Sequence, residues 1–127
     1  MVINSTYDIP YGGGYSACRR IVYIDRNIGD TFKAYDGQEY PLKPILVAHE
    51  IREVRLLKIF KRYNTAHRLS TYGDIALLLR LGVPIDEYYG HLHNSVEMAL
   101  NRWKAGQAEL PPDLDMLPYI EDGILVC

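Results

Sequence analysis

Three polar residues interrupt an apolar helical pattern between residues 44 and 62, and their types are those of metal and acid–base chemistry. They are one histidine, His49, and two glutamates, Glu50 and Glu53. At about 100° per residue, the leucines, the valines and Phe60 of this segment gather on one side of the predicted helix, with the three polar residues in the middle of that arc. The basic side chains gather on the opposite side and point away. Because a buried carboxylate needs a partner or gains a proton, we expect an electropositive partner for this cluster.

A second predicted helix repeats the pattern. It starts after Asn64 or Thr65, which are plausible N-caps, and stops at Gly82. His67 and Asp74 are seven residues apart, so they stack on one line along the helix, on the face that also carries Thr71, Leu77, Leu78 and Leu81. A short connection joins the two helices, so their polar residues are expected to face a common pocket.

A divalent metal ion would neutralise this cluster directly. His49 and Glu53 are at positions i and i+4 and reach one ion from one face, and His67 can reach it from the facing helix. Two histidines and one glutamate form a catalytic zinc set that leaves a position open for water. Glu50 would stand beside that water as a general base. Asp74 would either orient His67 or act as a fourth ligand.

The elements that must position these residues predict an α+β domain: a short N-terminal β-hairpin or sheet, three packed helices and an extended C-terminal tail. Residues 1–17 are expected to form an N-terminal arm, residues 18–106 the core, and residues 107–127 a strap over the surface. Residues 19–28 read as a strand and residues 31–37 as its hairpin partner. The third helix is expected from about Asp86 to Gly106. The Gly12–Gly14 segment reads as a turn, and its role toward the site stays open.

Length and charge limit the classes of function. A chain of 127 residues suits one domain, and a net charge of −2 favours neither nucleic acid nor an anionic membrane as partner. There is no apolar run of bilayer-spanning length and no secretory signal pattern, so we expect the bacterial cytoplasm or a virion as location. Cys18 and Cys127 are expected to be free thiols. The oligomeric state is not indicated.

The sequence "HEIRE" resembles the HExxH helix of the zincin metallopeptidases, with Glu53 in place of the second histidine. Together with "YDIPYGGGYS", "VYIDR" and "YNTAHRLSTYGD", it resembles small proteins of phages and bacteria with an HExxE…H pattern, over roughly residues 7–75. The resemblance implies a metal-binding, peptidase-like fold with His49, Glu53 and His67 as ligands and Glu50 as base. Zincins hold a peptide along an edge strand, for which "RRIVYIDR" is the candidate. The additional carboxylate ligand would shift the preference from zinc toward manganese or iron.

Two alternatives remain open at this point. Arginines of the predicted strand, at positions 19, 20 and 26, could pair with Glu50 and Glu53 and make the cluster a buried ion-pair network. The protein would then be a structural or assembly protein, for instance a phage virion component, that contacts a peptide or protein partner. His91 and His93 point about 160° apart on a helix and are not expected to share an ion. The leading expectation is a metal-dependent hydrolase of peptide or amide bonds.

Overall fold

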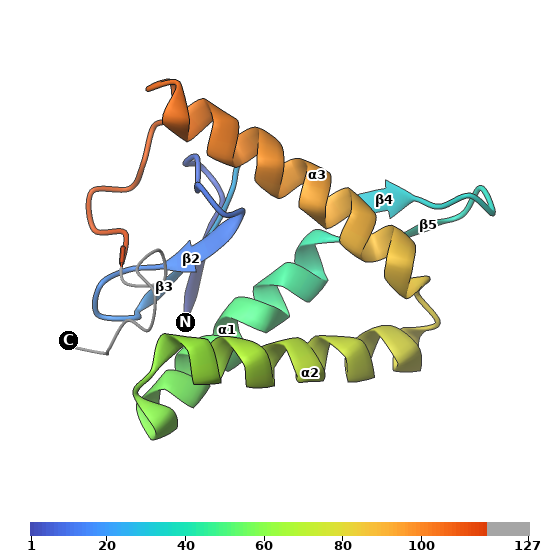
Figure 1. Ribbon diagram of the computed structural model, residues 1–127, viewed down its shortest axis with the longest axis horizontal. Coiled ribbons are helices and arrows are strands. Elements are labelled where there is room, and N and C mark those ends of the chain that lie inside the picture. The colour runs from blue at the N-terminus through green and yellow to red at the C-terminus, as the bar shows by residue number, and fades with distance from the viewer. Residues whose placement is uncertain (117–127) are drawn as a thin grey trace.

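The computed structural model, which describes residues 1–116, contains two small sheets followed by three helices (Figure 1). Strands β1 (Val2–Asn4), β3 (Ile21–Ile24) and β2 (Gly13–Tyr15) form one sheet in the order β1-β3-β2. β1 runs parallel to the central strand β3, and β2 runs antiparallel to it. Strands β4 (Thr31–Lys33) and β5 (Glu39–Pro41) form an antiparallel hairpin. This arrangement confirms the predicted α+β class.

The three helices lie close to their predicted bounds. They are α1 (Lys43–Phe60), α2 (Tyr63–Leu81) and α3 (Ile85–Lys104). Pro44 stands in the first turn of α1, where its missing N–H costs nothing. Gly82 ends α2 in a left-handed conformation with φ of 68°, and its N–H donates to carbonyls of the last turn. These two signals agree with the tertiary structure, but the predicted N-caps Asn64 and Thr65 are wrong: both lie inside α2, whose N-cap is Arg62 with no side-chain cap hydrogen bond.

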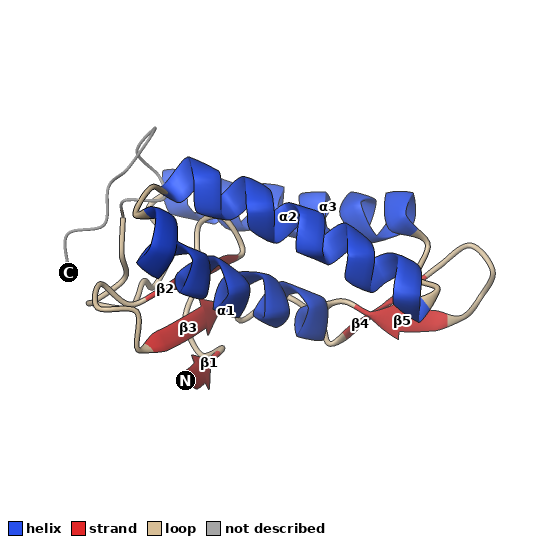
Figure 2. Ribbon diagram, turned by 90° about the horizontal axis from the view of Figure 1, so that it is seen from below, coloured by secondary structure: helices blue, strands red, loops and turns tan. Residues whose placement is uncertain are grey.

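The helices lie on one side of the molecule and the strands on the other (Figure 2). The main apolar core forms between these layers and includes Val22 of β3, Leu46 of α1, Leu78 of α2 and Tyr88 of α3. Helix α1 contacts both the three-stranded sheet and α2, so it is the element that brings the two layers together. A polar residue on its inner face therefore meets both the sheet and α2.

The N-terminal residues differ from the arm that we predicted. They contribute β1 and β2 to the sheet, and Ile9 and Tyr15 among them are fully buried. Gly13 and Gly14, expected in a turn, lie in β2. The predicted hairpin of residues 31–37 with the preceding strand is also wrong, because β4 pairs with β5 across a turn at Asp36–Gly37. An Asp-Gly pair is a strong signal for such a turn, since glycine accepts the positive φ of 83° found here.

Residues 107–116 run along the N-terminal segment as part of the expected strap. The backbone N–H of Asp8 donates to Glu109, that of Ala17 donates to Asp113, and that of Asp115 donates to Tyr15. The remainder of the predicted strap, residues 117–127, lies outside the described residues.

Two further expectations concern the cysteines and the lack of a membrane-spanning segment. Cys18 is disulfide-bonded, so a free thiol at this position is wrong, while Cys127 lies outside the described residues. Among the helices described, none has the length and apolar character needed to span a bilayer.

Candidate metal centre

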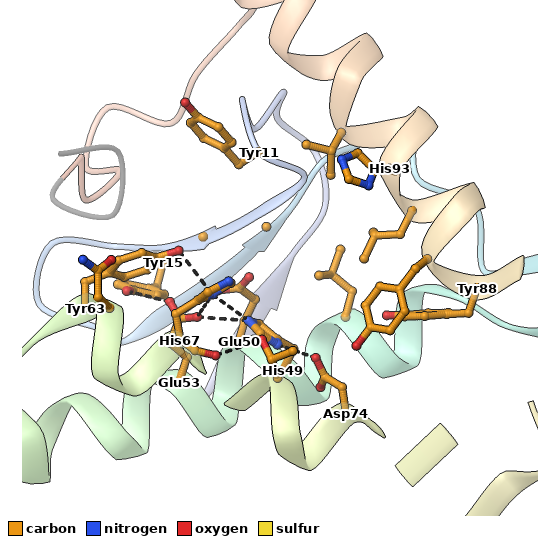
Figure 3. A pocket seen from close by; sticks show the side chains of 18 residues that line it. Tyr11, Tyr15, His49, Glu50, Glu53, Tyr63, His67, Asp74, Tyr88 and His93 are labelled. Carbon is orange, nitrogen blue, oxygen red and sulfur yellow. Dashed lines mark hydrogen bonds and ion pairs between the residues drawn. The ribbon is translucent and has the colours of Figure 1, made fainter. Parts of the chain in front are cut away.

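Three ligand-type atoms from α1 and α2 meet at one point (Figure 3). Glu53 Oε2 lies 3.0 Å from His49 Nε2 and 2.9 Å from His67 Nδ1, and the two nitrogens are 3.3 Å apart. Four-residue spacing places His49 and Glu53 on one face of α1, and α2 supplies His67 from the facing side. Within residues 1–116, these three residues form the group of potential metal ligands.

The spacing of these atoms fits a small ion. A tetrahedral zinc site with bonds of about 2.0–2.2 Å separates its ligand atoms by about 3.3–3.6 Å. The three separations, from 2.9 to 3.3 Å, are only slightly shorter, so small side-chain rotations would open the triangle to that size. Imidazole nitrogen and carboxylate oxygen are also the atom types that zinc, manganese and iron accept.

Burial is uneven across the cluster. His49, Glu50 and Glu53 are each at most 6% exposed, which confirms that they face the core. The side chain of His67 is 48% exposed and stands at the rim, so its predicted core-facing position is wrong. An ion held here would be bound from the buried side and open toward solvent.

Asp74 contacts a different histidine from the one predicted. Its Oδ2 lies 2.6 Å from His49 Nδ1, and its Oδ1 accepts a hydrogen bond from Arg52 Nη1 at 2.9 Å. Asp74 and His67 are two helical turns apart on α2, about 10 Å along the axis, too far for one to orient the other. The crossing of α2 over α1 instead places Asp74 beside His49. Arg52 is one of the basic residues of α1 that were predicted to point away from the cluster, but its guanidinium reaches around α1 to make this contact.

The protonation of His49 follows from these neighbours. Burial alone would lower the pKa of His49, but hydrogen bonds with Asp74 and Glu53 outweigh it and raise the pKa to about 10. Without a metal, His49 is therefore an imidazolium between two carboxylates. A metal at Nε2 would replace the proton there, while Nδ1 would keep its proton and donate it in a hydrogen bond to Asp74, which is the usual arrangement around a metal-bound histidine.

The side chain of Glu50 carries a buried carboxyl group beside the ligand cluster. Burial raises its pKa well above the ordinary glutamate value, the charge of Glu53 raises it further, and His49 opposes the shift. Strand β2 passes directly over it. A Cβ on Gly13 would lie only 2.6 Å from Glu50 Oε1, so glycine is what allows the strand to approach so closely.

Two tyrosines that sequence reasoning did not assign to the site hold the ligands in place. Tyr15 Oη donates to Glu53 Oε1 at 3.0 Å and leaves Oε2 directed at the histidines. The ring of Tyr63 stacks on His67 with centroids 5.3 Å apart. The alternation of β2 puts Tyr15 on the same face as Gly13, but that signal becomes usable only once β2 is known to be a strand.

The ligand cluster opens into a cavity of about 500 Å³. Its walls come from β2, from the three helices and from Tyr11. His93 lines this cavity, whereas His91 packs on Phe32 with ring centroids 4.9 Å apart. The expectation that these two histidines do not share an ion agrees with their separate positions.

The structure also bears on two further expectations: the partners of the strand arginines, and the strand that lies beside the cluster. Arg19 pairs with Asp115 at 2.8 Å and Arg26 with Asp8 at 2.9 Å, so these two arginines are engaged elsewhere than at Glu50 and Glu53. The strand beside the cluster is β2, an edge of its sheet, and not the predicted "RRIVYIDR" segment, whose strand β3 is central. Strand order is a non-local property that the sequence pattern did not reveal.

No known family, curated protein or solved structure matches this chain.

Proposed function

We propose that the protein is a metal-dependent hydrolase of peptide or amide bonds, with zinc as its metal and manganese or iron as alternatives. One observation carries the proposal: three ligand-type atoms from His49, Glu53 and His67 lie within 3.3 Å of one another at a cavity that also contains the carboxyl of Glu50. A bound metal would act as a Lewis acid and lower the pKa of its water. The resemblance to zincins in "HEIRE" agrees with this assignment.

Each neighbouring side chain has a defined task in this proposal. Glu50 takes the proton from the attacking water and passes it to the leaving amine. Asp74 holds the Nδ1 proton of His49, so that Nε2 presents its lone pair to the ion. Tyr15 holds one oxygen of Glu53 and leaves the other free to bind. The positive charge of the ion would also favour the ionised form of Glu50 that a base requires.

Strand β2 supports a peptide as substrate. The carbonyl of Gly12 and the N–H of Ser16 bond to the β3 side, so by alternation the backbone groups of Gly13 point to the free edge. Among the described residues, Asp115 covers the far end of that edge, where its backbone N–H donates to the carbonyl of Tyr15. An extended peptide could pair with the backbone groups of Gly13 on this edge, beside Glu50.

The first experiment is elemental analysis of the purified protein beside a His49→Ala, His67→Ala double variant. We expect about one equivalent of metal in the native protein and loss of that metal in the variant. Native protein that holds no zinc, manganese or iron even after reloading would exclude the metal centre.

A second experiment tests Glu50 as the base. The Glu50→Gln variant should keep the metal and lose cleavage of fluorescently labelled casein, and full activity in this variant would exclude Glu50 as the base.

A second candidate is a non-catalytic structural or assembly protein, for instance of a phage virion. The observation that favours it is the position of His49: as an imidazolium it is balanced by Glu53 and Asp74, so the cluster is satisfied without an ion. This candidate predicts no bound metal, and it predicts that Glu50→Gln changes nothing except stability. The same two measurements therefore separate the candidates.

A further inference from the structure

The outer edge of β2 is partly occupied by the strap of the same chain. The backbone N–H of Ala17 donates to the carbonyl of Asp113 at 2.8 Å, and that of Asp115 donates to the carbonyl of Tyr15 at 2.9 Å. Residue numbers rise along the strap as they fall along this edge, and the bridge between the two bonds is antiparallel. Residues 113–115 therefore add to β2 as a short antiparallel strand.

This part of the strap is firmly attached to the sheet. Leu114 is buried in an apolar cluster that also contains Tyr23. The hydroxyl of Tyr23 donates to Asp113 Oδ1 at 2.6 Å. Arg19 pairs with Asp115 at 2.8 Å, and each of these two side chains is at most 7% exposed. A peptide that binds to β2 therefore has to fit beside residues 113–115 and cannot readily displace them.

The register of the strap determines how a second chain can pair with β2. Asp115 stands opposite Tyr15, and the backbone groups of Gly13 follow on the same edge, beside Glu50. An antiparallel peptide paired with Gly13 runs in the same direction as the strap, so its N-terminal side points toward Asp115. The position two residues before the pair with Gly13 is already taken by Asp115. The peptide must therefore begin no more than one residue before that pair.

The charges around the cavity agree with an amino terminus at this place. Among the described residues that line it are the carboxyl groups of Glu50, Glu53 and Asp74, and none of those lining residues is a lysine or an arginine. A terminal ammonium group carries donors only and suits backbone carbonyls and carboxylates. A peptide bound in the opposite direction would bring a terminal carboxylate to the same place, where no cationic side chain of the lining could pair with it.

We propose that the substrate is the N-terminal end of a peptide and that the protein removes its first one or two residues. This substrate class rests on the proposed hydrolase function. Water supplies the hydroxyl group to the carbonyl carbon and the proton to the leaving amine, so the C–N bond breaks without another reactant. Residues 113–115 of the strap are the specificity-determining segment, because they end the edge on which the substrate pairs. Long chains such as casein are then trimmed from the N-terminus.

The test uses the hexapeptide Leu-Ala-Leu-Ala-Leu-Ala in three forms: free at both ends, N-succinylated, and C-terminally amidated. Zinc-loaded native protein is incubated with each form, and the products are identified by mass spectrometry. The free and amidated forms should lose their first one or two residues. The succinylated form should be cleaved about 10-fold more slowly or less, because the cap removes a charged hydrogen-bond donor and lengthens the chain. Internal cleavage of all three forms at equal rates would overturn the proposal and leave the hydrolase function intact.

A binding measurement separates recognition of the terminus from catalysis. In isothermal titration calorimetry with zinc-loaded Glu50→Gln protein, the free peptide should bind about 10-fold more tightly than the succinylated one. Equal affinities, or no binding of either form, would overturn the proposal. If native protein cleaves none of the peptides but this preference is found, the hydrolase function fails and recognition of the N-terminus stands.

A variant of the strap tests its part in the selection. Asp115→Pro removes the N–H that bonds the carbonyl of Tyr15, so this variant should lose most of the discrimination against the succinylated peptide. Met116→Pro is the matched control, because the N–H of Met116 makes no hydrogen bond with the described residues. Unchanged discrimination in a folded Asp115→Pro protein would overturn the role of the strap. If that variant does not fold, the comparison of the peptides decides alone.

Discussion

At the scale of single residues, His49 joins the two parts of the site. One ring nitrogen faces Glu53 and His67, and the other faces Asp74, which is in turn held by Arg52. The close passage of Arg52 over Gly73, where a Cβ would lie 2.6 Å from its guanidinium, explains a glycine in the middle of α2. The ligand geometry thus depends on side chains that would not touch the ion.

The first prediction concerns Asp74. Asp74→Asn weakens the acceptor for the Nδ1 proton of His49 and leaves Arg52 without its carboxylate. We expect zinc affinity to fall about 10-fold or more, as for other residues that orient metal ligands. The measurement is competition with a chromogenic chelator. Asp86→Asn, an exposed acid on α3, serves as control. Equal zinc affinity in native protein and Asp74→Asn would show that Asp74 does not orient the site.

The second prediction concerns Gly13. Gly13→Ala places a methyl group 2.6 Å from Glu50 Oε1, so the strand or the carboxyl must move. We expect a loss of about 1–3 kcal/mol in the free energy of unfolding, measured with urea. Gly90→Ala is the matched control, because its methyl group on α3 meets no atom within 4 Å. That change should stabilise by about 0.5–1 kcal/mol. Equal stability of Gly13→Ala and native protein would contradict the close approach.

At the scale of elements, a buried carboxylate joins the N-terminal segment to the strap. Asp8 accepts hydrogen bonds from the guanidinium of Arg26 and from the backbone N–H of Glu109. Burial raises the pKa of Asp8, but these bonds outweigh it, and the pKa lies below the model-peptide value of 3.8. The ionised form therefore stabilises the folded state above the unfolded pKa, and this contribution is lost as the pH falls through the folded pKa.

The third prediction concerns the loss of stability that follows when Asp8 is protonated. Native protein should lose stability below about pH 4, and Asp8→Asn should be less stable at pH 7 by about 1–3 kcal/mol and lose less on acidification. Urea unfolding at several pH values between 7 and 3 measures both effects. Asp30→Asn, whose side chain is 84% exposed, should behave as native protein. A parallel acid response in Asp8→Asn and native protein would assign the acid sensitivity to other groups.

At the scale of the whole molecule, the candidate metal ligands join α1 to α2 at the end where α2 begins. An ion bound there holds only the folded state together, because the unfolded chain does not assemble the three ligands. The fourth prediction is that zinc at about 100 times its Kd raises the free energy of unfolding by about 2.7 kcal/mol and raises Tm accordingly. The His49→Ala, His67→Ala variant should show no such shift, while His91→Ala should retain it. A Tm indifferent to zinc in native protein would exclude the site.

The local features of this protein could be predicted from its amino-acid sequence. A period of 3.6 residues fixes which side chains share a helical face, so the three helices and the burial of His49, Glu50 and Glu53 followed from the order of residues. The position of His49 and Glu53 on one helical face also followed from the sequence, because the two residues are four positions apart. At the helix ends this rule failed, because Phe60 and Leu81 are 46% and 51% exposed.

Which helix and strand faces meet depends on tertiary packing and could not be predicted from the sequence. The crossing of α2 over α1 gave Asp74 to His49 and left His67 at the rim. The strand order placed Gly13 over Glu50, brought Tyr15 to Glu53 and made β2 the edge beside the cluster. These contacts join residues far apart in the chain. Their geometry depends on how whole layers pack, and no local periodicity carries that information.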